Sequence, residues 1–348
     1  MYPLNRGDFL NNYIITINAE QVNLMFGASD PDESRASAPE VDSLSSALVK
    51  QMIREKFEPN KKNNLLLADA YQIAGLTNGA DKAVRLAACA RWLEFALPPD
   101  AADKRYKVVK TTSCHVRLCP VCQWRRSLNT FRNLAQIYEA VPGYKHLFLT
   151  LTQKNVEGEA LADEIKKISD AFTKMMRRKP WKDIVKGYTR TIEVTISKDG
   201  TFHPHIHAIL TVSKSYGSKN YLSQNKVCEE WQKALCTDYK PVCDIRAIKN
   251  MNGKAIAEVA KYSVKPADYI NGDAFHIAEI VKWLDSALDG KRFISYGGII
   301  KDKKQEIFSK VNLEDIEAET IPKTEWENWE RVIYEWHFYA QKYNKITV

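Results

Sequence analysis

The sequence lacks the features that mark membrane and secreted proteins. No window reaches the roughly 18 apolar residues that a membrane-spanning helix requires, and the first 20 residues lack a basic stretch followed by a long apolar run. A disulfide framework is also disfavoured, because the seven cysteines are odd in number and four of them fall between residues 89 and 122. We therefore expect a cytoplasmic protein that has no membrane partner and whose clustered cysteines hold a metal.

The composition is that of a globular protein. With 348 residues, 45% of them hydrophobic and 27% charged, the chain can bury a substantial core and form one or two domains. The 51 Lys and Arg residues exceed the 43 Asp and Glu residues by 8. This excess suits a polyanionic partner, but it also fits a role in solubility alone. The sequence contains no internal repeat.

The first part of the chain predicts a linker followed by helices. Residues 28–46 are rich in Ser, Pro, Asp and Glu and poor in large apolar side chains, which predicts a flexible linker at the end of an N-terminal segment, 1–47. Apolar residues then recur at helical spacing over 46–58 and 81–97, where two prolines end the pattern. A helical region is therefore expected over 48–135.

The middle of the chain alternates between strand and helix patterns. The patterns predict strands over 145–153, 187–197, 201–212 and 243–248, and helices over 159–179, 223–235 and 253–264. The pair Asp199-Gly200 separates the second and third strands and is favoured in tight hairpin turns. We expect these two strands to pair as a hairpin, and Pro266 to end the last helix.

Three of the seven histidines occupy alternate positions in the segment "TFHPHIHAIL". His203, His205 and His207 therefore share one face of the predicted strand. On the neighbouring strand Glu193 alternates with apolar residues, so its carboxylate can meet the imidazoles across the hairpin. The alternative is a strand with one solvated polar face. Two imidazoles and one carboxylate leave coordination positions open, which suits Mg²⁺ or Mn²⁺ with phosphate oxygens.

A second cluster lies in "CHVRLCPVCQWRRS". Cys119 and Cys122 form a CxxC pair, Cys114 lies five residues upstream, and Cys89 precedes them. Four thiolates make a closed tetrahedral zinc site, although Cys89 could instead be an ordinary buried residue, with His115 as the fourth ligand. The arginines that follow, Arg125 and Arg126, would be held beside the ion. The remaining cysteines are irregularly spaced and are expected to be reduced structural residues: Cys228, Cys236 and Cys243.

A third group lies in "AEVAKYSVKPADY". Glu258, Tyr262 and Lys265 are spaced at i, i+4 and i+7, which would place a carboxylate, a phenol and an ammonium on one helix face. The ordinary alternative is a solvated helix face that carries an amphipathic tyrosine.

Taken together, these segments resemble a known family, the replication initiator (Rep) proteins of rolling-circle plasmids within the HUH superfamily of single-strand endonucleases. The resemblance is carried, in the family order, by "FLTLT" with Asn155 and Gly158 after it, "EVTIS", "HPHIHAIL" and "KYSVKPADY". The segments "RLCPVCQWRRS" and "KRFISYGGIIK" also look like family sequence, so the resemblance extends from about residue 85 to about residue 310.

The resemblance implies an α+β fold, with an antiparallel sheet and flanking helices, in an HUH endonuclease domain over 140–270. A helical and zinc-binding region over 48–135 would precede it, and an origin-binding or accessory region over 271–348 would follow. The family motif has an apolar residue between two histidines, which Ile206 satisfies. The resemblance therefore assigns the metal to His205 and His207, with Glu193, and leaves His203 as an alternate ligand or a phosphate contact.

The resemblance also implies a reaction on origin DNA, single-stranded or in a hairpin, in a prokaryotic cytoplasm. Tyr262, helped by Lys265 or Lys261, would attack the phosphodiester to give a 5′-phosphotyrosyl adduct and a 3′-hydroxyl primer. Glu258 would activate water for the final cleavage, and Tyr269 is the alternative as a second nucleophile. Host helicase and DNA polymerase are the expected partners.

DNA contacts are expected from Arg125, Arg126 and Lys261. Two other interpretations remain open. The chain could be an HUH transposase or conjugative relaxase, or it could be a non-catalytic zinc-containing DNA-binding regulator in which the histidines merely line a strand. The oligomeric state is not predicted.

Overall fold

The computed structural model describes residues 43–217, 220–249, 253–308 and 326–346, and nearly all of the predicted N-terminal segment and linker lies outside these ranges. Within them the chain forms two compact units. The cysteine unit contains residues 43–68, 80–122 and 326–346, and the histidine unit contains residues 69–79 and 123–308.

These units divide the chain differently from the ranges expected from sequence. Residues 271–308 belong to the histidine unit, together with the predicted nuclease range, whereas 326–346 complete the fold of the cysteine unit. A C-terminal region over 271–348 is therefore not a compact unit of its own in the described chain.

The cysteine unit combines helices with a four-stranded antiparallel sheet in the order β2-β1-β8-β9. Its strands are β1 Trp92–Leu97, β2 Lys107–Thr111, β8 Glu330–His337 and β9 Lys342–Ile346. Its helical elements are α3 Leu44–Met52, the π-helical turn η1 Ile53–Phe57, the first part of α4 Glu58–Ile73, and α5 Gly79–Ala88. Edge-to-face contacts at about 6 Å join Phe95 to Phe57 and to Tyr334 in the core.

The prediction of one helix over 81–97 is wrong in its second half. Helix α5 ends at Ala88, Ala90 adopts a left-handed backbone conformation with φ of 52°, and β1 follows. Strand β1 pairs along its whole length with β8, near the other end of the sequence. Local periodicity could not reveal a strand that is stabilised by so distant a partner.

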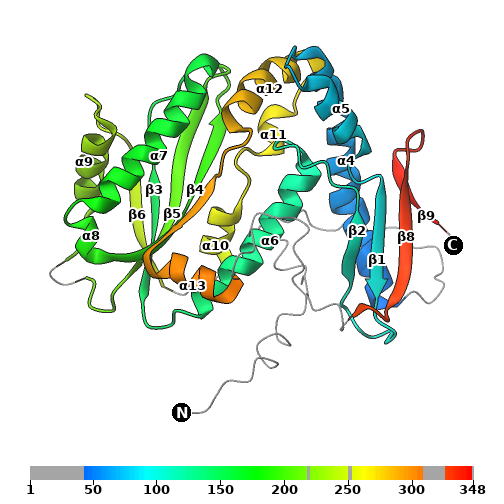
Figure 1. Ribbon diagram of the computed structural model, residues 1–348, viewed down its shortest axis with the longest axis horizontal. Helices are drawn as coiled ribbons and strands as arrows, with labels where there is room; N and C mark the ends of the chain where they lie inside the picture. Colours follow the sequence, from blue (N-terminus) through cyan, green and yellow to red (C-terminus); the bar gives the residue numbers. More distant parts are fainter. Residues whose placement is uncertain (1–42, 218–219, 250–252, 309–325, 347–348) are drawn as a thin grey trace. The chain divides into compact units, whose positions relative to one another are not determined.

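The histidine unit is built on a five-stranded antiparallel sheet in the order β6-β3-β5-β4-β7 (Figure 1). Its strands are β3 Lys145–Leu151, β4 Val185–Ile196, β5 Phe202–Val212, β6 Cys243–Ile248 and β7 Ile294–Gly297. Its helices are most of α6 Pro120–Glu139, then η2 Gly158–Ala160, α7 Leu161–Arg177, α8 Trp181–Ile184, α9 Gln224–Leu235, α10 Gly253–Ala260, α11 Pro266–Tyr269, α12 Ala274–Leu288 and α13 Gly298–Phe308. The predicted α+β class is confirmed.

Helices cover both faces of this sheet. On one face Arg190 of β4 donates a 2.6 Å hydrogen bond to Ser169 of α7. On the other face, which also carries Glu193 and the histidines, Tyr138 of α6 donates to Thr189 at 2.9 Å. The candidate site lies on the same face as this contact, further along β4 toward the hairpin turn.

The predicted hairpin of β4 and β5 is confirmed. Ser197 donates its backbone N–H to Thr201 at 2.9 Å, and Gly200 takes the positive φ, 83°, that the turn requires. The register places Glu193 directly opposite His205. All the side chains of the predicted cluster therefore lie on one face.

Candidate active site

The hairpin brings three potential metal ligands together. Oε2 of Glu193 lies 3.2 Å from Nε2 of His207 and 3.5 Å from Nε2 of His205. One ligand atom from each residue lies within 4.8 Å of the other two. This group of one carboxylate and two imidazoles could hold a divalent ion, as the sequence predicts.

Hydrogen bonds at Nδ1, on the side of each ring away from Glu193, orient the two imidazoles. Nδ1 of His205 lies 3.1 Å from the carbonyl oxygen of His203, and because a carbonyl can only accept, Nδ1 donates this bond while Nε2 faces the Glu193 carboxylate. Nδ1 of His207 lies 3.2 Å from Oγ1 of Thr150 on β3. Such outer contacts fix the ring orientation of metal-binding histidines. No role was assigned to Thr150 from the sequence.

Glu193 is buried, with 4% of the residue exposed. Burial by itself would raise the pKa of this carboxyl, but the hydrogen bonds and charges of His205 and His207 outweigh it and hold the pKa below its usual value. Lys265 adds a further contact, since its Nζ lies 3.5 Å from Oε1 of Glu193. The carboxylate is therefore kept ionised between three nitrogen-bearing side chains.

His203 lies outside the ligand group. Its Nδ1 lies 2.7 Å from Oδ1 of Asn155, whose amide in turn donates to Ser197 and Thr201 at the hairpin turn. Burial and the neighbouring His205 lower the pKa of His203. His203 is thus hydrogen-bonded to Asn155 and is not in the Glu193 group, although its ring centroid lies 5.4 Å from that of His205.

The tyrosine segment differs from the prediction. Helix α10 ends at Ala260, so Tyr262 and Lys265 do not continue the helix of Glu258, and Pro266 starts α11 instead of ending α10. The cause lies on the sheet, where β7 pairs with β4 only as far as Thr191.

Beyond that point the tyrosine segment takes the place of a strand beside β4. The N–H of Val194 donates to the carbonyl of Ser263 at 2.7 Å. Tyr262 is therefore next in sequence to a residue bonded beside Glu193. Part of its side chain is exposed, and burial of the remainder raises the pKa of the phenol.

The other two predicted catalytic residues, Glu258 and Tyr269, interact with residues outside the Glu193 group. Glu258 accepts a 2.5 Å hydrogen bond from Lys261, and 41% of its side chain is exposed. Tyr269 is completely buried and its hydroxyl accepts a hydrogen bond from Gln123 at 3.0 Å. A buried phenol in this environment is poorly placed as a second nucleophile.

The four predicted zinc ligands form one buried cluster in the cysteine unit. Sγ of Cys89 lies 3.5 Å from Sγ of Cys119 and 3.7 Å from Sγ of Cys122, and Cys114 lies 3.7 Å from Cys122. All four sulfur atoms lie within 4.8 Å of one another, and His115 is not in the group. Four thiols at these separations fit a tetrahedral ion.

Lys61 is a neighbour of this cluster that the sequence did not reveal. It is completely buried, and its Nζ donates to the carbonyls of Ala87 at 2.5 Å and Cys89 at 2.7 Å. Burial lowers the pKa of Lys61 to about 8, although the nearby cysteines raise it in part. A lysine in α4 has no local feature that distinguishes it from a surface residue.

The remaining predicted residues are distributed as follows. Arg125 and Arg126 lie in α6 and are partly exposed. None of the seven cysteines is in a disulfide, and of the three outside the cluster only Cys236 is exposed. Among the described residues, no helix is long and apolar enough to cross a membrane.

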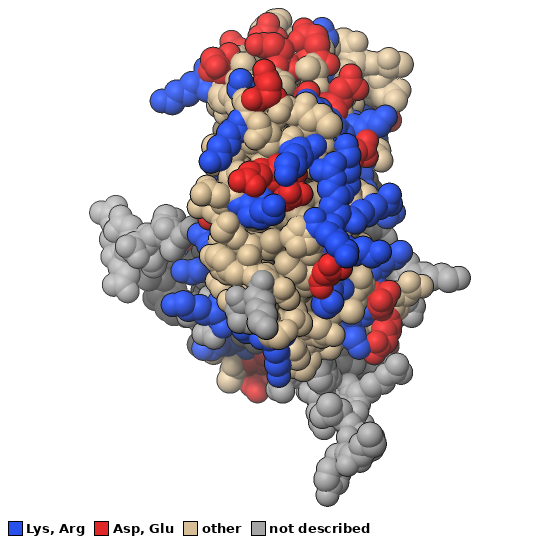
Figure 2. Space-filling view, turned by 90° about the vertical axis from the view of Figure 1, so that its left-hand side faces the viewer, with Lys and Arg blue, Asp and Glu red and all other residues tan. Residues whose placement is uncertain are grey.

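Charge is unevenly distributed over the surface. Figure 2 shows Lys and Arg side chains gathered over the middle of one face, and Asp and Glu side chains concentrated at its upper end. At the end of α7, Lys174, Arg177 and Arg178 line a hollow of about 550 Å³. Basic regions of this kind suit a phosphate backbone.

An antiparallel α+β unit with a Glu-His-His group and an adjacent tyrosine segment is the arrangement expected of a plasmid replication initiator. The chain matches the model of the Replication protein family over residues 105–344. It is 36% identical to a Protein rep of Bacillus amyloliquefaciens over 310 residues, which cover 80% of this chain and 90% of that protein.

Two further relatives agree. A Protein rep of Lactiplantibacillus plantarum is 39% identical over 260 residues, or 68% of this chain and 81% of that protein. A Protein rep of Lentilactobacillus hilgardii is 33% identical over 296 residues, which cover 80% of this chain and 90% of that protein. No solved structure matches the chain. The chain belongs to the Replication protein family, and the resemblance to replication initiators of rolling-circle plasmids is confirmed.

Proposed function

We propose that the protein starts plasmid replication by nicking one strand of origin DNA and later rejoins strands, through a covalent bond between Tyr262 and a 5′ phosphate. The observation that supports this most directly is the hairpin geometry. Ligand atoms of Glu193, His205 and His207 lie within 4.8 Å of one another, and the tyrosine segment is bonded to the same strand through Ser263.

The metal group fits Mn²⁺ or Mg²⁺ because two nitrogen ligands and one oxygen ligand leave open positions for phosphate oxygens. A bound ion would polarise the scissile phosphodiester and offset the charge that develops on it. Glu193, His205 and His207 would hold the ion. Lys265, already in contact with Glu193, places a further positive charge at the site.

Tyr262 is the nucleophile in this proposal. Its phenol loses a proton, the oxygen bonds to phosphorus, and the bond from phosphorus to the 3′ oxygen breaks. The 3′ oxygen takes up a proton and becomes the hydroxyl that primes synthesis. The phosphodiester is conserved as a phosphotyrosine, so attack by a later 3′-hydroxyl reverses the step and joins strands.

Glu258 is proposed as the general base that activates water for the last cleavage. Its side chain is partly exposed, but in the structure its carboxylate already accepts a hydrogen bond from Lys261. Binding of DNA would have to separate this pair, because phosphate competes for the lysine. Lys261 would then contact the strand, as Arg125 and Arg126 are also proposed to do.

The cysteine unit is proposed to hold a structural zinc ion through Cys89, Cys114, Cys119 and Cys122. The substrate is proposed to be origin DNA, single-stranded or extruded as a hairpin. Host helicase and DNA polymerase would act after the nick, since extension of the 3′ end needs an unwound template and a polymerase.

A covalent-adduct assay tests the proposal. The full chain is incubated with Mn²⁺ and 5′- or 3′-labelled single-stranded oligonucleotides that tile the replicon carrying the gene, and products are separated under denaturing conditions. We expect a labelled protein band for one oligonucleotide, carrying the sequence 3′ of the nick. Tight binding without any covalent band at any oligonucleotide would instead indicate a non-catalytic regulator.

A further inference from the structure

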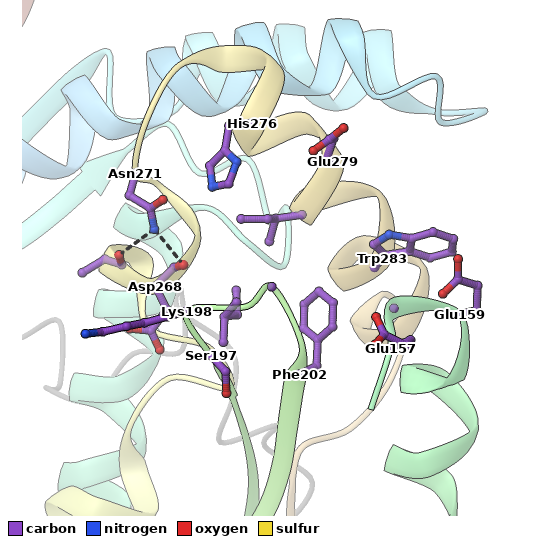
Figure 3. A pocket seen from close by; sticks show the side chains of 15 residues that line it. Glu157, Glu159, Ser197, Lys198, Phe202, Asp268, Asn271, His276, Glu279 and Trp283 are labelled. Atoms are coloured by element: carbon purple, nitrogen blue, oxygen red, sulfur yellow. Dashed lines mark hydrogen bonds between the residues drawn. The ribbon is translucent and has the colours of Figure 1, made fainter. Parts of the chain in front are cut away.

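A cavity of about 620 Å³ lies at the turn end of the β4–β5 hairpin but stands apart from the metal group (Figure 3). Ile196 and Phe202 line it, and they belong to the sheet face opposite Glu193 and His205. The charged residues of its lining are mostly acidic: Glu157, Glu159, Asp268 and Glu279, with Lys198. Such a lining repels phosphate, so we do not assign this cavity to the DNA strand.

The cysteine unit contains a buried charged group to which the proposed function gives no role, the ammonium of Lys61 in α4. The residue is 0% exposed. It donates to two backbone carbonyls, those of Ala87 at 2.5 Å and Cys89 at 2.7 Å. In the described part of the chain no carboxylate forms an ion pair with it. Because burial of an unpaired charge is costly, the two carbonyls must be what keeps this ammonium in place.

These carbonyls belong to the reversal of the chain from α5 into β1. The last carbonyls of a helix have no partner within it, and their partial negative charge favours a cation. Four consecutive carbonyls, from Ala87 to Ala90, accept hydrogen bonds from side chains of other segments. Their donors, in that order, are Lys61 of α4, Thr112 after β2, Lys61 again, and Tyr343 of β9. The reversal is therefore held from three directions.

This reversal places the sulfur of Cys89 in the zinc group. The other three candidate ligands fall within residues 114–122, whereas Cys89 directly follows the end of α5. Its Sγ lies 3.5 Å from that of Cys119. A zinc–sulfur bond is only about 2.3 Å long, so a small movement of this backbone would remove the fourth ligand. His115, the alternative from sequence, is exposed and outside the group.

We propose that Lys61 is a positioning residue for the zinc group: it holds the carbonyls on either side of the Ala88–Cys89 step and so keeps Cys89 as the fourth ligand. This inference rests on the proposed zinc site and is independent of nicking. A lysine that only capped α5 would stabilise the fold without affecting the ligands. The two roles can be separated by the spectrum of a bound metal.

The test uses Co²⁺ in place of Zn²⁺ in the reduced full chain and records the absorption that arises from charge transfer between thiolate and cobalt. The Glu193 group has no thiolate and does not contribute to it. Lys61→Met keeps a long side chain and removes the donors. Its absorption per bound ion should fall by about a quarter, to the value of Cys89→Ser, because three of four thiolates remain. Lys62→Met changes an exposed neighbour in α4 and should keep the wild-type spectrum.

The affinity for Zn²⁺ follows from competition, measured as loss of the same absorption. Contacts that orient metal ligands are worth about 10–100-fold in affinity, so Lys61→Met should bind Zn²⁺ at least about tenfold more weakly. In protein that already carries Cys89→Ser, the same change should cost about twofold or less, because a residue that acts through another adds little once that other is gone.

A second variant tests the same reversal if Lys61→Met does not fold. Tyr343→Phe keeps the ring and removes only the hydrogen bond to the carbonyl of Ala90. We expect it to weaken Zn²⁺ binding by about fivefold, the worth of one hydrogen bond, and again only when Cys89 is present.

Two results would overturn the inference. One is a wild-type spectrum and affinity in Lys61→Met, or in Tyr343→Phe where that variant carries the test. The other is an equal loss of affinity with and without Cys89, since the lysine would then support the unit as a whole. Absence of the charge-transfer absorption from the wild-type protein would overturn the zinc assignment together with the inference. A protein that shows the expected spectra but forms no covalent adduct would contradict the proposed reaction alone.

Discussion

The backbone carbonyl of Ser263 accepts a 2.7 Å hydrogen bond from the N–H of Val194, and this bond joins the tyrosine segment to the strand that carries Glu193. It replaces the strand pairing that β7 no longer supplies beyond Thr191. The proposed nucleophile Tyr262 is therefore one residue away from a residue bonded to the strand of the candidate metal group.

The first prediction concerns the metal group. His205→Ala with His207→Ala is expected to lower Mn²⁺-dependent nicking by about 10³-fold, because the charge stabilisation lost is worth several kcal/mol. Mn²⁺ binding measured by calorimetry should disappear, whereas DNA affinity should change little. His337→Ala, at an exposed histidine of β8, serves as the control and should keep both Mn²⁺ binding and nicking. Normal cleavage by the double variant in EDTA would exclude these histidines as metal ligands.

The second prediction concerns zinc. Elemental analysis of protein purified without chelator should give one zinc per chain. Cys119→Ser should lose the ion and destabilise the cysteine unit by on the order of 5 kcal/mol, since metal binding free energy contributes to folding at such sites. Cys236→Ser changes an exposed cysteine outside the cluster and should retain zinc and stability. An absence of zinc from the wild-type protein would contradict the assignment.

The third prediction concerns the nucleophile. Tyr262→Phe keeps the ring and removes the attacking oxygen, so neither adduct nor nick should form at any pH, while DNA still binds. The control is Tyr221→Phe, an equivalent change at a tyrosine that is 66% exposed, and it should nick normally. Adduct formation by the Tyr262 variant would require another nucleophile, for which burial makes Tyr269 a poor candidate.

The fourth prediction separates Glu258 from Tyr262 by stage. Glu258→Gln should form the adduct at a normal rate but release it slowly, so that covalent complex accumulates over time. Lys261→Met, which removes the partner of Glu258, should weaken DNA binding and leave hydrolysis of the adduct intact. If termination is normal in the Glu258 variant, the general-base role is wrong. If no adduct forms in a folded variant, Glu258 acts in the first step.

The fifth prediction concerns acid stability. Burial lowers the pKa of His146 to about 4, below the usual 6.5. Between these values the unfolded chain binds a proton that the folded chain excludes, so stability falls as pH decreases from 6.5 to 4. His146→Gln should reduce this loss by about 2 kcal/mol, measured by urea unfolding at pH 7 and pH 5. An unchanged pH dependence in the variant would show that His146 does not carry the effect.

The sequence predicted the hairpin well because its determinants are local. Alternation fixes which side chains share a face, and the Asp199-Gly200 turn sets the register that places His205 opposite Glu193. The cysteine cluster was likewise predictable from the CxxC pair, although the choice of Cys89 over His115 depends on the chain reversal at Ala90.

The errors arose where distant segments decide the local structure. Ile256, Val259 and Ala260 continue a helical pattern toward Tyr262, yet the helix ends because the next residues pair with the uncovered edge of β4. Strand β1 could not be recognised without β8. Lys61 became notable only when the fold buried it against the backbone of Cys89.

The two candidate ion sites should exchange their ions at very different rates. The ligands in the hairpin are set by strand register, and contacts such as that between Thr150 and His207 hold them without help from an ion. An ion there can leave and be replaced with little rearrangement of the chain. The four cysteines come from the end of α5, the loop after β2 and the start of α6, and these segments must separate before a buried ion escapes. An ion bound by the hairpin would therefore be able to turn over with the substrate, whereas one bound by the four cysteines would stay while the unit remains folded.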